Sequence, residues 1–219
     1  MQAAILGSAA RKASWQILAG ENNTYSWVQD TQSNKNFDIF IDLDFDSHPE
    51  SIKDYCGNTT TIFLLSAVTT TPELAMALQG MTYNGEKFYG INAIPTFLER
   101  RTLEISNPFG LAQETLPSLP WWDNYEFVKS RIGMITPRIV FMIINEAYYT
   151  FQEGTAEKAD IDTAMKLGTN YPKGPFQWCQ EAGIDNVYNT LNALWKDTRD
   201  ERYKICPTLK TEWLHTKLT

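Results

Sequence analysis

Cysteine and histidine are scarce in this sequence of 219 residues, which has three of the first and two of the second. The cysteines, Cys56, Cys179 and Cys206, are too few and too scattered for a zinc site or a disulfide framework. We interpret them as ordinary thiols of a reducing compartment. The histidines, His48 and His215, lie far apart in the chain and lack metal-ligand spacing. The sequence therefore predicts neither a metal site nor a disulfide-stabilised fold.

The sequence also lacks an excess of positive charge and a long apolar run. Lys and Arg number 19 against 26 Asp and Glu, and the resulting net charge of -7 argues against binding to nucleic acid or to an anionic membrane surface. No run of roughly eighteen uncharged apolar residues is present, and the opening residues carry no cationic segment of the kind that begins a signal peptide. We expect a cytoplasmic protein with no membrane or nucleic-acid partner.

What is present is the composition of a folded globular chain, with 43% hydrophobic and 21% charged residues. In the first half, short apolar segments alternate with segments of helical periodicity, which predicts a mostly parallel sheet. The expected strands cover residues 3–7, 25–30, 37–43, 61–66 and 87–92, and the expected helices cover residues 9–18, 49–55 and 72–78. The segment 107–122 is rich in proline and aromatic residues and is expected to be irregular.

The second half has the pattern of long helices. They are expected over residues 137–153, 158–167, 177–182 and 184–194. The apolar run 139–144 is too continuous for a helix with one solvated face, so we expect a second copy of the chain to cover part of it. The change of pattern near residue 132 predicts an α/β domain over residues 1–132 and an all-α domain over residues 133–219.

One segment of the second half has a distinctive spacing of residues. The sequence DIDTAMKLG at 160–168 is followed by PKGP at 172–175, where Gly168 is expected to end the helix in the left-handed conformation. This segment closely resembles the signature of the C-terminal domain of 3-hydroxyacyl-CoA dehydrogenases, and the resemblance extends from residue 133 to about 194. It implies a helical dimerisation domain over residues 133–219, preceded by a Rossmann-like domain that binds NAD.

Such a domain needs the pattern G-x-G-x-x-G after its first strand, where glycines let the backbone approach the cofactor pyrophosphate. Here GSAARK stands in that place, and only Gly7 matches. Ala9 puts a methyl group where the backbone should meet phosphate. Arg11 or Lys12 could offset the phosphate charge, but we favour the interpretation of both as parts of a solvated helix face. The resemblance therefore implies a degenerate phosphate site.

The acidic residue that binds the cofactor ribose lies about twenty residues after the glycine pattern, which makes Asp30 the candidate. The family has several tens of residues between this acid and the strand that resembles residues 37–43, whereas this chain reaches the strand almost directly. We therefore predict a trimmed dinucleotide-binding domain over residues 1–132.

Catalysis in the resembled family uses a histidine base, a glutamate that orients it, an asparagine and a serine. A comparison without gaps places Asn92 at the histidine and Glu104 at the glutamate. Pro137 falls at the asparagine, and Thr69 is a loose match to the serine. An amide cannot act as a base at neutral pH. The resemblance thus implies that the base and the catalytic amide are lost, while an acid and a hydroxyl are kept.

Three functions are compatible with these residues. The family favours an active NAD-dependent dehydrogenase of fatty-acid metabolism with a rearranged site, in which His48 could replace the base. The residues favour a catalytically impaired relative, a pseudoenzyme that forms a homodimer and binds an acyl-CoA-like or other small ligand. A non-catalytic interaction subunit is the third possibility, with Trp121, Trp122 and Tyr125 as its contact surface.

Overall fold

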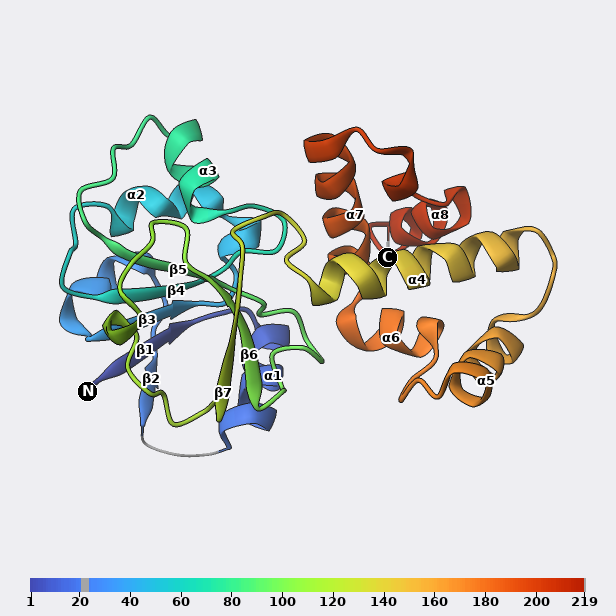
Figure 1. Ribbon diagram of the computed structural model, residues 1–219, viewed down its shortest axis with the longest axis horizontal. Helices are drawn as coiled ribbons and strands as arrows, with labels where there is room; N and C mark the ends of the chain where they lie inside the picture. The colour runs from blue at the N-terminus through green and yellow to red at the C-terminus, as the bar shows by residue number, and fades with distance from the viewer. Residues whose placement is uncertain (21–23, 219) are drawn as a thin grey trace. The chain divides into compact units, whose positions relative to one another are not determined.

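The computed structural model describes residues 1–20 and 24–218 and divides into two compact units, Met1–Met134 and Ile135–Thr219. The first unit is built on a sheet with helices, and the second is made of helices (Figure 1). A mostly parallel sheet followed by a helical region confirms the predicted fold class. Among the described residues, no helix is long and apolar enough to cross a membrane.

The described part of the first unit contains one sheet of seven strands in the order β2-β1-β3-β4-β5-β6-β7. The strands are β1 (Ala3–Leu6), β2 (Tyr25–Trp27), β3 (Ile39–Asp42), β4 (Ile62–Ser66), β5 (Lys87–Ile91), β6 (Thr102–Ser106) and β7 (Asn124–Val128). All neighbours pair in parallel except β5 and β6, which are antiparallel. The order reverses between β2 and β3, on either side of β1. Such a reversal is the switch point of doubly wound folds.

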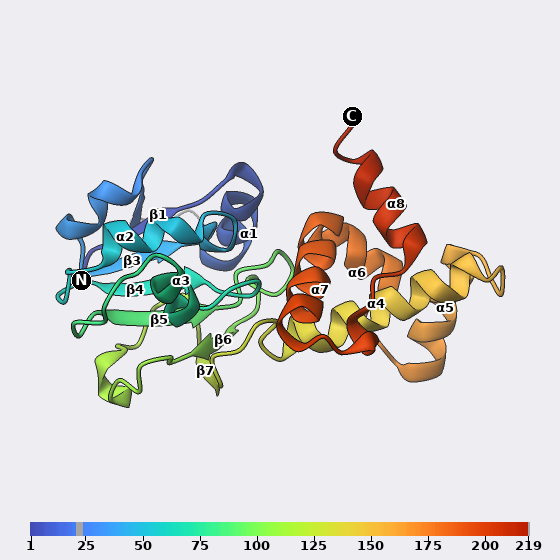
Figure 2. The ribbon, with the colours of Figure 1, turned by 90° about the horizontal axis from the view of Figure 1, so that it is seen from above.

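Helices cover both faces of this sheet because buried strands alternate their side chains between two apolar layers. Ile39 and Ile41 pack with Trp15 of α1 (Ala9–Ala19), whereas Phe40 packs with Tyr55 of α2 (Ile52–Tyr55). Helix α3 (Pro72–Leu78) lies on the same face as α2, and both are seen over the strands in Figure 2. The expected helix over 49–55 is a 3-10 turn followed by the four residues of α2.

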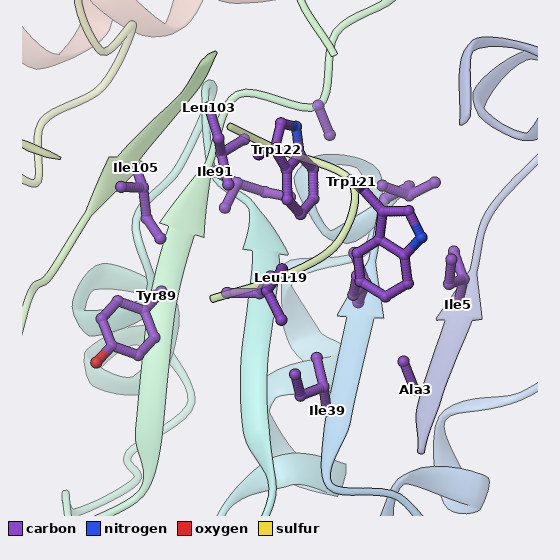
Figure 3. Packing of buried hydrophobic residues seen from close by; sticks show 14 of the residues in the cluster. Ala3, Ile5, Ile39, Tyr89, Ile91, Leu103, Ile105, Leu119, Trp121 and Trp122 are labelled. Atoms are coloured by element: carbon purple, nitrogen blue, oxygen red, sulfur yellow. The ribbon is translucent and has the colours of Figure 1, made fainter. Parts of the chain in front are cut away.

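The aromatic segment before β7 is irregular, as expected, apart from a short 3-10 turn. Figure 3 shows Leu119, Trp121 and Trp122 over the α1 face of the sheet. Trp121 and Trp122 are 2% and 3% exposed, and their rings lie 4.9 and 5.6 Å from the ring of Trp15. The predicted contact surface at these two tryptophans is therefore wrong, because their rings fill the core.

Strands β6 and β7 have no counterpart among the predicted strands. The residues of β7 are all exposed or only half-buried, although its sequence NYEFV alternates polar and aromatic residues over its first four positions. β7 pairs in parallel with β6, with Leu103 opposite Tyr125. Pairing between these two segments forms this edge of the sheet.

The second unit consists of five α-helices and one 3-10 turn among the described residues. The helices are α4 (Thr136–Gln152), α5 (Lys158–Thr169), α6 (Pro175–Ala182), α7 (Ile184–Thr198) and α8 (Pro207–His215). Helix α7 is longer than expected, and α8 was not predicted. On α4, Phe141 and Ile144 are fully buried, but Ile139 is 56% exposed. The helical unit therefore buries only some of the apolar side chains of residues 139–144.

The DIDTAMKLG segment has a clear structural role in this unit. The carboxylate of Asp162 on α5 accepts hydrogen bonds from the main-chain N–H groups of Phe176 and Gln177, at 2.8 and 3.1 Å, and so caps the start of α6. A Cβ at Gly174 would overlap the Asp162 side chain, so glycine is needed there. The expected helix end at Gly168 is wrong: α5 continues to Thr169, and Asn170 takes the left-handed conformation, with φ 56°.

Candidate functional site

The topology places the candidate site at the carboxyl ends of β1 and β3, because ligands of doubly wound sheets bind outside the switch point. Strand β1 leads into Gly7 and Ser8, and β3 leads into the segment 43–46. The main-chain N–H of Leu43 is donated to the Leu6 carbonyl at 2.9 Å, which holds the two strand ends together. Side chains that follow these strands therefore meet at one edge of the sheet.

Ser8 and Asp44 form the contact between these two loops. The main-chain N–H of Ser8 is donated to Asp44 Oδ2, and the Ser8 hydroxyl is donated to Asp44 Oδ1 at 3.0 Å. Ser8 precedes α1, and Ala9, the candidate for phosphate approach, is the first residue of that helix and is exposed. The Asp44 carboxylate thus lies at the N-terminus of α1.

Arg11, in the first turn of α1, lies next to the contact of Ser8 with Asp44. It is 6% exposed, its Nε is 3.8 Å from Asp44 Oδ1, and its Nη1 donates a hydrogen bond to the carbonyl of Ala93. Burial lowers the pKa of the Arg11 guanidinium, while the charges of Asp46 and Asp44 oppose that effect. The interpretation of Arg11 as part of a solvated helix face is wrong. Lys12 stacks over Trp27, with Nζ 5.1 Å from the ring centre.

Asp42, the last residue of β3, is 2% exposed. Burial raises its pKa to about 6, although hydrogen bonds from the Tyr55 hydroxyl (2.7 Å) and from the Asp44 N–H (3.0 Å) oppose this rise. The second of these bonds also fixes the main chain of Asp44, the next acidic residue of the loop.

Thr69, the candidate for the family serine, is held by a third carboxylate of the same loop. Its hydroxyl donates to Asp46 Oδ1 at 2.9 Å, and its main-chain N–H donates to the same oxygen at 2.6 Å. Asp46 also accepts hydrogen bonds from the Ser66 hydroxyl and the Val68 N–H, at 2.6 and 2.8 Å. The hydroxyl of Thr69 is therefore engaged in joining the β3 and β4 loops.

Asn92 and Glu104, the candidates for the family's histidine and glutamate, lie side by side. Asn92 follows β5, is 3% exposed, and donates from Nδ2 to Glu104 Oε2 at 3.2 Å. Its Oδ1 accepts a hydrogen bond from the Ile94 N–H at 3.3 Å. The pair lies at the end of the antiparallel pairing of β5 and β6. Its carboxylate is the one group of the two side chains that could take up a proton from an alcohol near pH 7.

The remaining candidates have local surroundings of their own. Asp30 is exposed after β2, and its carboxylate accepts from the N–H and hydroxyl of Ser33, both at 3.1 Å, as the cap of a 3-10 turn. The His48 side chain is 71% exposed, with Nδ1 3.7 Å from Glu50 Oε1. Pro137 is buried in the first turn of α4, in the helical unit.

Two features of the site were missed by the sequence reasoning, namely the contact of Asp44 with Ser8 and the anchoring role of Asp46. The available signal was the alternation of acids, Asp42, Asp44 and Asp46, directly after a buried strand. Carboxylates at the end of a parallel strand point to the edge where ligands bind. Within residues 1–20 and 24–218, no group of three or more His, Cys, Asp and Glu side chains is arranged to hold a metal ion.

Comparison with known proteins identifies the helical unit. Residues 133–219 match the model of the 3-hydroxyacyl-CoA dehydrogenase C-terminal domain. The chain is 45% identical over 78 residues to 3-hydroxyadipyl-CoA dehydrogenase of Escherichia coli, which covers 36% of this chain and 16% of that protein. It is 36% identical over 89 residues to a probable 3-hydroxybutyryl-CoA dehydrogenase of Bacillus subtilis, covering 39% and 31% of the two chains. These matches span less than a third of the relatives' own length.

Solved structures resemble the chain over nearly its whole length. The (S)-3-hydroxybutyryl-CoA dehydrogenase of Ralstonia eutropha matches with a TM-score of 0.68 and 17% identity, over 96% of this chain and 92% of the other. FadB2 of M. tuberculosis matches with a TM-score of 0.73 and 11% identity, over 98% and 93%. At such low sequence identities, these structural matches show that the fold is shared and nothing more. The helical unit is therefore similar to the C-terminal domain of 3-hydroxyacyl-CoA dehydrogenases, and the chain shares the fold of these solved structures.

Proposed function

We propose that this protein is a catalytically impaired relative of the 3-hydroxyacyl-CoA dehydrogenases that binds an acyl-CoA-like or other small ligand. The observation that carries the proposal is the pairing of Asn92 with Glu104 at the place assigned to the family's histidine and glutamate. Oxidation of a 3-hydroxyl group requires a base for the hydroxyl proton while hydride leaves to the nicotinamide of NAD. The amide of Asn92 does not supply one.

An active dehydrogenase with a rearranged site is the alternative. It would need a different base, and His48 and Glu104 are the two candidates. The imidazole of His48 is largely exposed beside Glu50, whereas a general base works best where water is excluded. Glu104 already accepts a hydrogen bond from Asn92. Both observations favour the impaired relative.

The enzymatic test follows NADH absorbance in the presence of acetoacetyl-CoA, with a thermal-shift titration of acetoacetyl-CoA alongside. We expect no turnover, and a rise in Tm with the CoA ester that free acetoacetate does not produce. Turnover at an ordinary enzymatic rate would overturn the proposal. In that case the His48→Ala and Glu104→Gln variants would show which of the two replaces the base.

We also propose a homodimer formed through the helical domain. Ile135 and Ile139 at the start of α4 are 50% and 56% exposed, and exposed apolar side chains on one helix favour contact with a second copy. The Ile139→Glu variant is expected to be monomeric by sedimentation at micromolar concentration. Leu78→Glu, the same kind of change at an exposed residue of α3, is expected to remain dimeric. A monomeric native protein would contradict this proposal. A cytoplasmic location stays a prediction from the sequence.

A further inference from the structure

A dinucleotide needs unoccupied donors at the turn between β1 and α1. In doubly wound folds the pyrophosphate lies against the main-chain N–H groups of this turn, at the positive end of the following helix. Here the N–H and the hydroxyl of Ser8 are both donated to Asp44. The residues of this turn therefore do not fit a pyrophosphate group.

We propose that the Asp44 carboxylate is a built-in anion that fills the place of the cofactor pyrophosphate and excludes NAD and related dinucleotides from this edge of the sheet. The inference goes beyond the proposed function, which rests on residue 92, because it concerns binding at the β1/β3 switch point. It assigns to Asp44 a role in ligand specificity.

The local structure holds Asp44 in this place. The Leu43 N–H bonds to the Leu6 carbonyl, so Asp44 directly follows the β1/β3 pairing. Its own N–H is donated to the buried Asp42 carboxylate at 3.0 Å, and its Oδ1 lies 3.8 Å from Arg11 Nε. Its side chain is 23% exposed. Main-chain and side-chain contacts thus fix the carboxylate in one position.

Charge at the site opposes phosphate as well. Asp46 lies in the same loop as Asp44, and the charges of both act on the buried guanidinium of Arg11. The positive charge that a pyrophosphate would use is therefore already compensated by carboxylates. A dinucleotide would have to displace Asp44 and leave two negative charges facing its own, and like charges at close range weaken binding.

The test compares the native protein with Asp44→Ala and Asp44→Asn by titration with NADH, followed by fluorescence, and with inorganic pyrophosphate, followed by thermal shift. We expect no saturable binding of either probe to the native protein up to about 1 mM. In Asp44→Ala the donors of Ser8 lose their anion and one of the two carboxylates that act on Arg11 is removed, so pyrophosphate is expected to bind at least about tenfold more tightly. Asp44→Asn, which keeps the shape of the side chain and removes its charge, should gain affinity in the same direction.

Asp38→Ala is the matched control. The Asp38 carboxylate also accepts a main-chain N–H from the β1 segment, that of Gln2 at 2.7 Å, but at the opposite end of β3. It should bind pyrophosphate no better than the native protein. Saturable NADH binding by the native protein overturns the inference, as does a gain in Asp38→Ala equal to that in the Asp44 variants. Binding of NADH without turnover would leave the proposed function intact, so the two failures are distinguishable.

Discussion

The side-chain amide of Asn92 faces the carboxylate of Glu104 across the antiparallel pair of β5 and β6, with 3.2 Å between Nδ2 and Oε2. The main chains of the same two residues are joined as well, because the Asn92 N–H is donated to the Glu104 carbonyl at 3.1 Å. Asn92 is buried. The pair therefore serves as a structural link between the strands.

Replacing Glu104 by Ala leaves the buried amide of Asn92 without this acceptor. We expect a loss of about 1–3 kcal/mol in the free energy of unfolding, measured with urea. Glu126→Ala is the control, because Glu126 lies in register with Glu104 on β7 and is exposed. Its effect should stay within about 0.5 kcal/mol. Equal losses in the two variants would show that the Asn92–Glu104 contact contributes nothing specific.

The raised pKa of Asp42 predicts a pH dependence of stability. Its pKa is about 6 in the folded protein, against 3.8 for the ordinary carboxyl group, so the folded state binds a proton more tightly than the unfolded state. Ionisation of Asp42 therefore destabilises the fold as pH rises from about 4 to about 6.5, by about 3 kcal/mol in total.

The measurement compares the native protein with Asp42→Asn by urea unfolding at a series of pH values. The stability of the native protein relative to the variant should be greatest near pH 4 and should fall as the pH approaches 6.5. Tyr55, Asp44 and Asp46, the groups that influence the pKa of Asp42, are present in both proteins, so their direct contributions largely cancel. A difference that does not change with pH would contradict the raised pKa.

Asp162→Ala removes the carboxylate that caps α6. Two main-chain N–H groups, those of Phe176 and Gln177, lose their acceptor, and the expected cost is about 1–2 kcal/mol of unfolding free energy. Asp160→Ala removes an exposed carboxylate two residues earlier on α5 and should cost less. If thermal or urea unfolding ranks the two variants in the opposite order, Asp162 is not the cap of α6.

Trp121→Ala tests the placement of the aromatic segment in the core. The buried indole contacts Trp15 and donates from Nε1 to Thr24 Oγ1 at 3.2 Å, so its removal leaves a large cavity. We expect a loss of about 3–5 kcal/mol by urea unfolding. Phe127→Ala, a change of an aromatic residue that is 38% exposed on β7, should cost clearly less. Native stability in Trp121→Ala would place this ring at the surface.

The local sequence pattern was sufficient to predict those helices and strands whose bounds are set by neighbouring residues in the chain. The bounds of α3, Pro72–Leu78, agree with the prediction because proline at the first turn and a capping Thr71 define its start. The five predicted strands are present, and β3 and β4, which are buried on both faces, have distinctive apolar sequences. The partly exposed β7 lacked that signal.

In the candidate site too, some contacts could be predicted from the sequence and others could not. The resemblance placed Asn92 and Glu104 at paired positions, and the structure brings them within hydrogen-bond distance. The contact of Asp44 with Ser8 joins residues 36 positions apart and depends on the register of β1 against β3, which no local pattern encodes.

The sequence by itself determined the α/β half, the helical half and the resemblance of residues 133–194 to the family signature, and it predicted that Asn92 stands in place of the family's histidine. Only the tertiary structure decided that Trp121 is core, that Arg11 is buried, and that a carboxylate of the chain lies at the N-terminus of α1. The physical reason is that helix and strand preferences act between neighbours in the chain, whereas burial and charge pairing arise where distant strand ends meet.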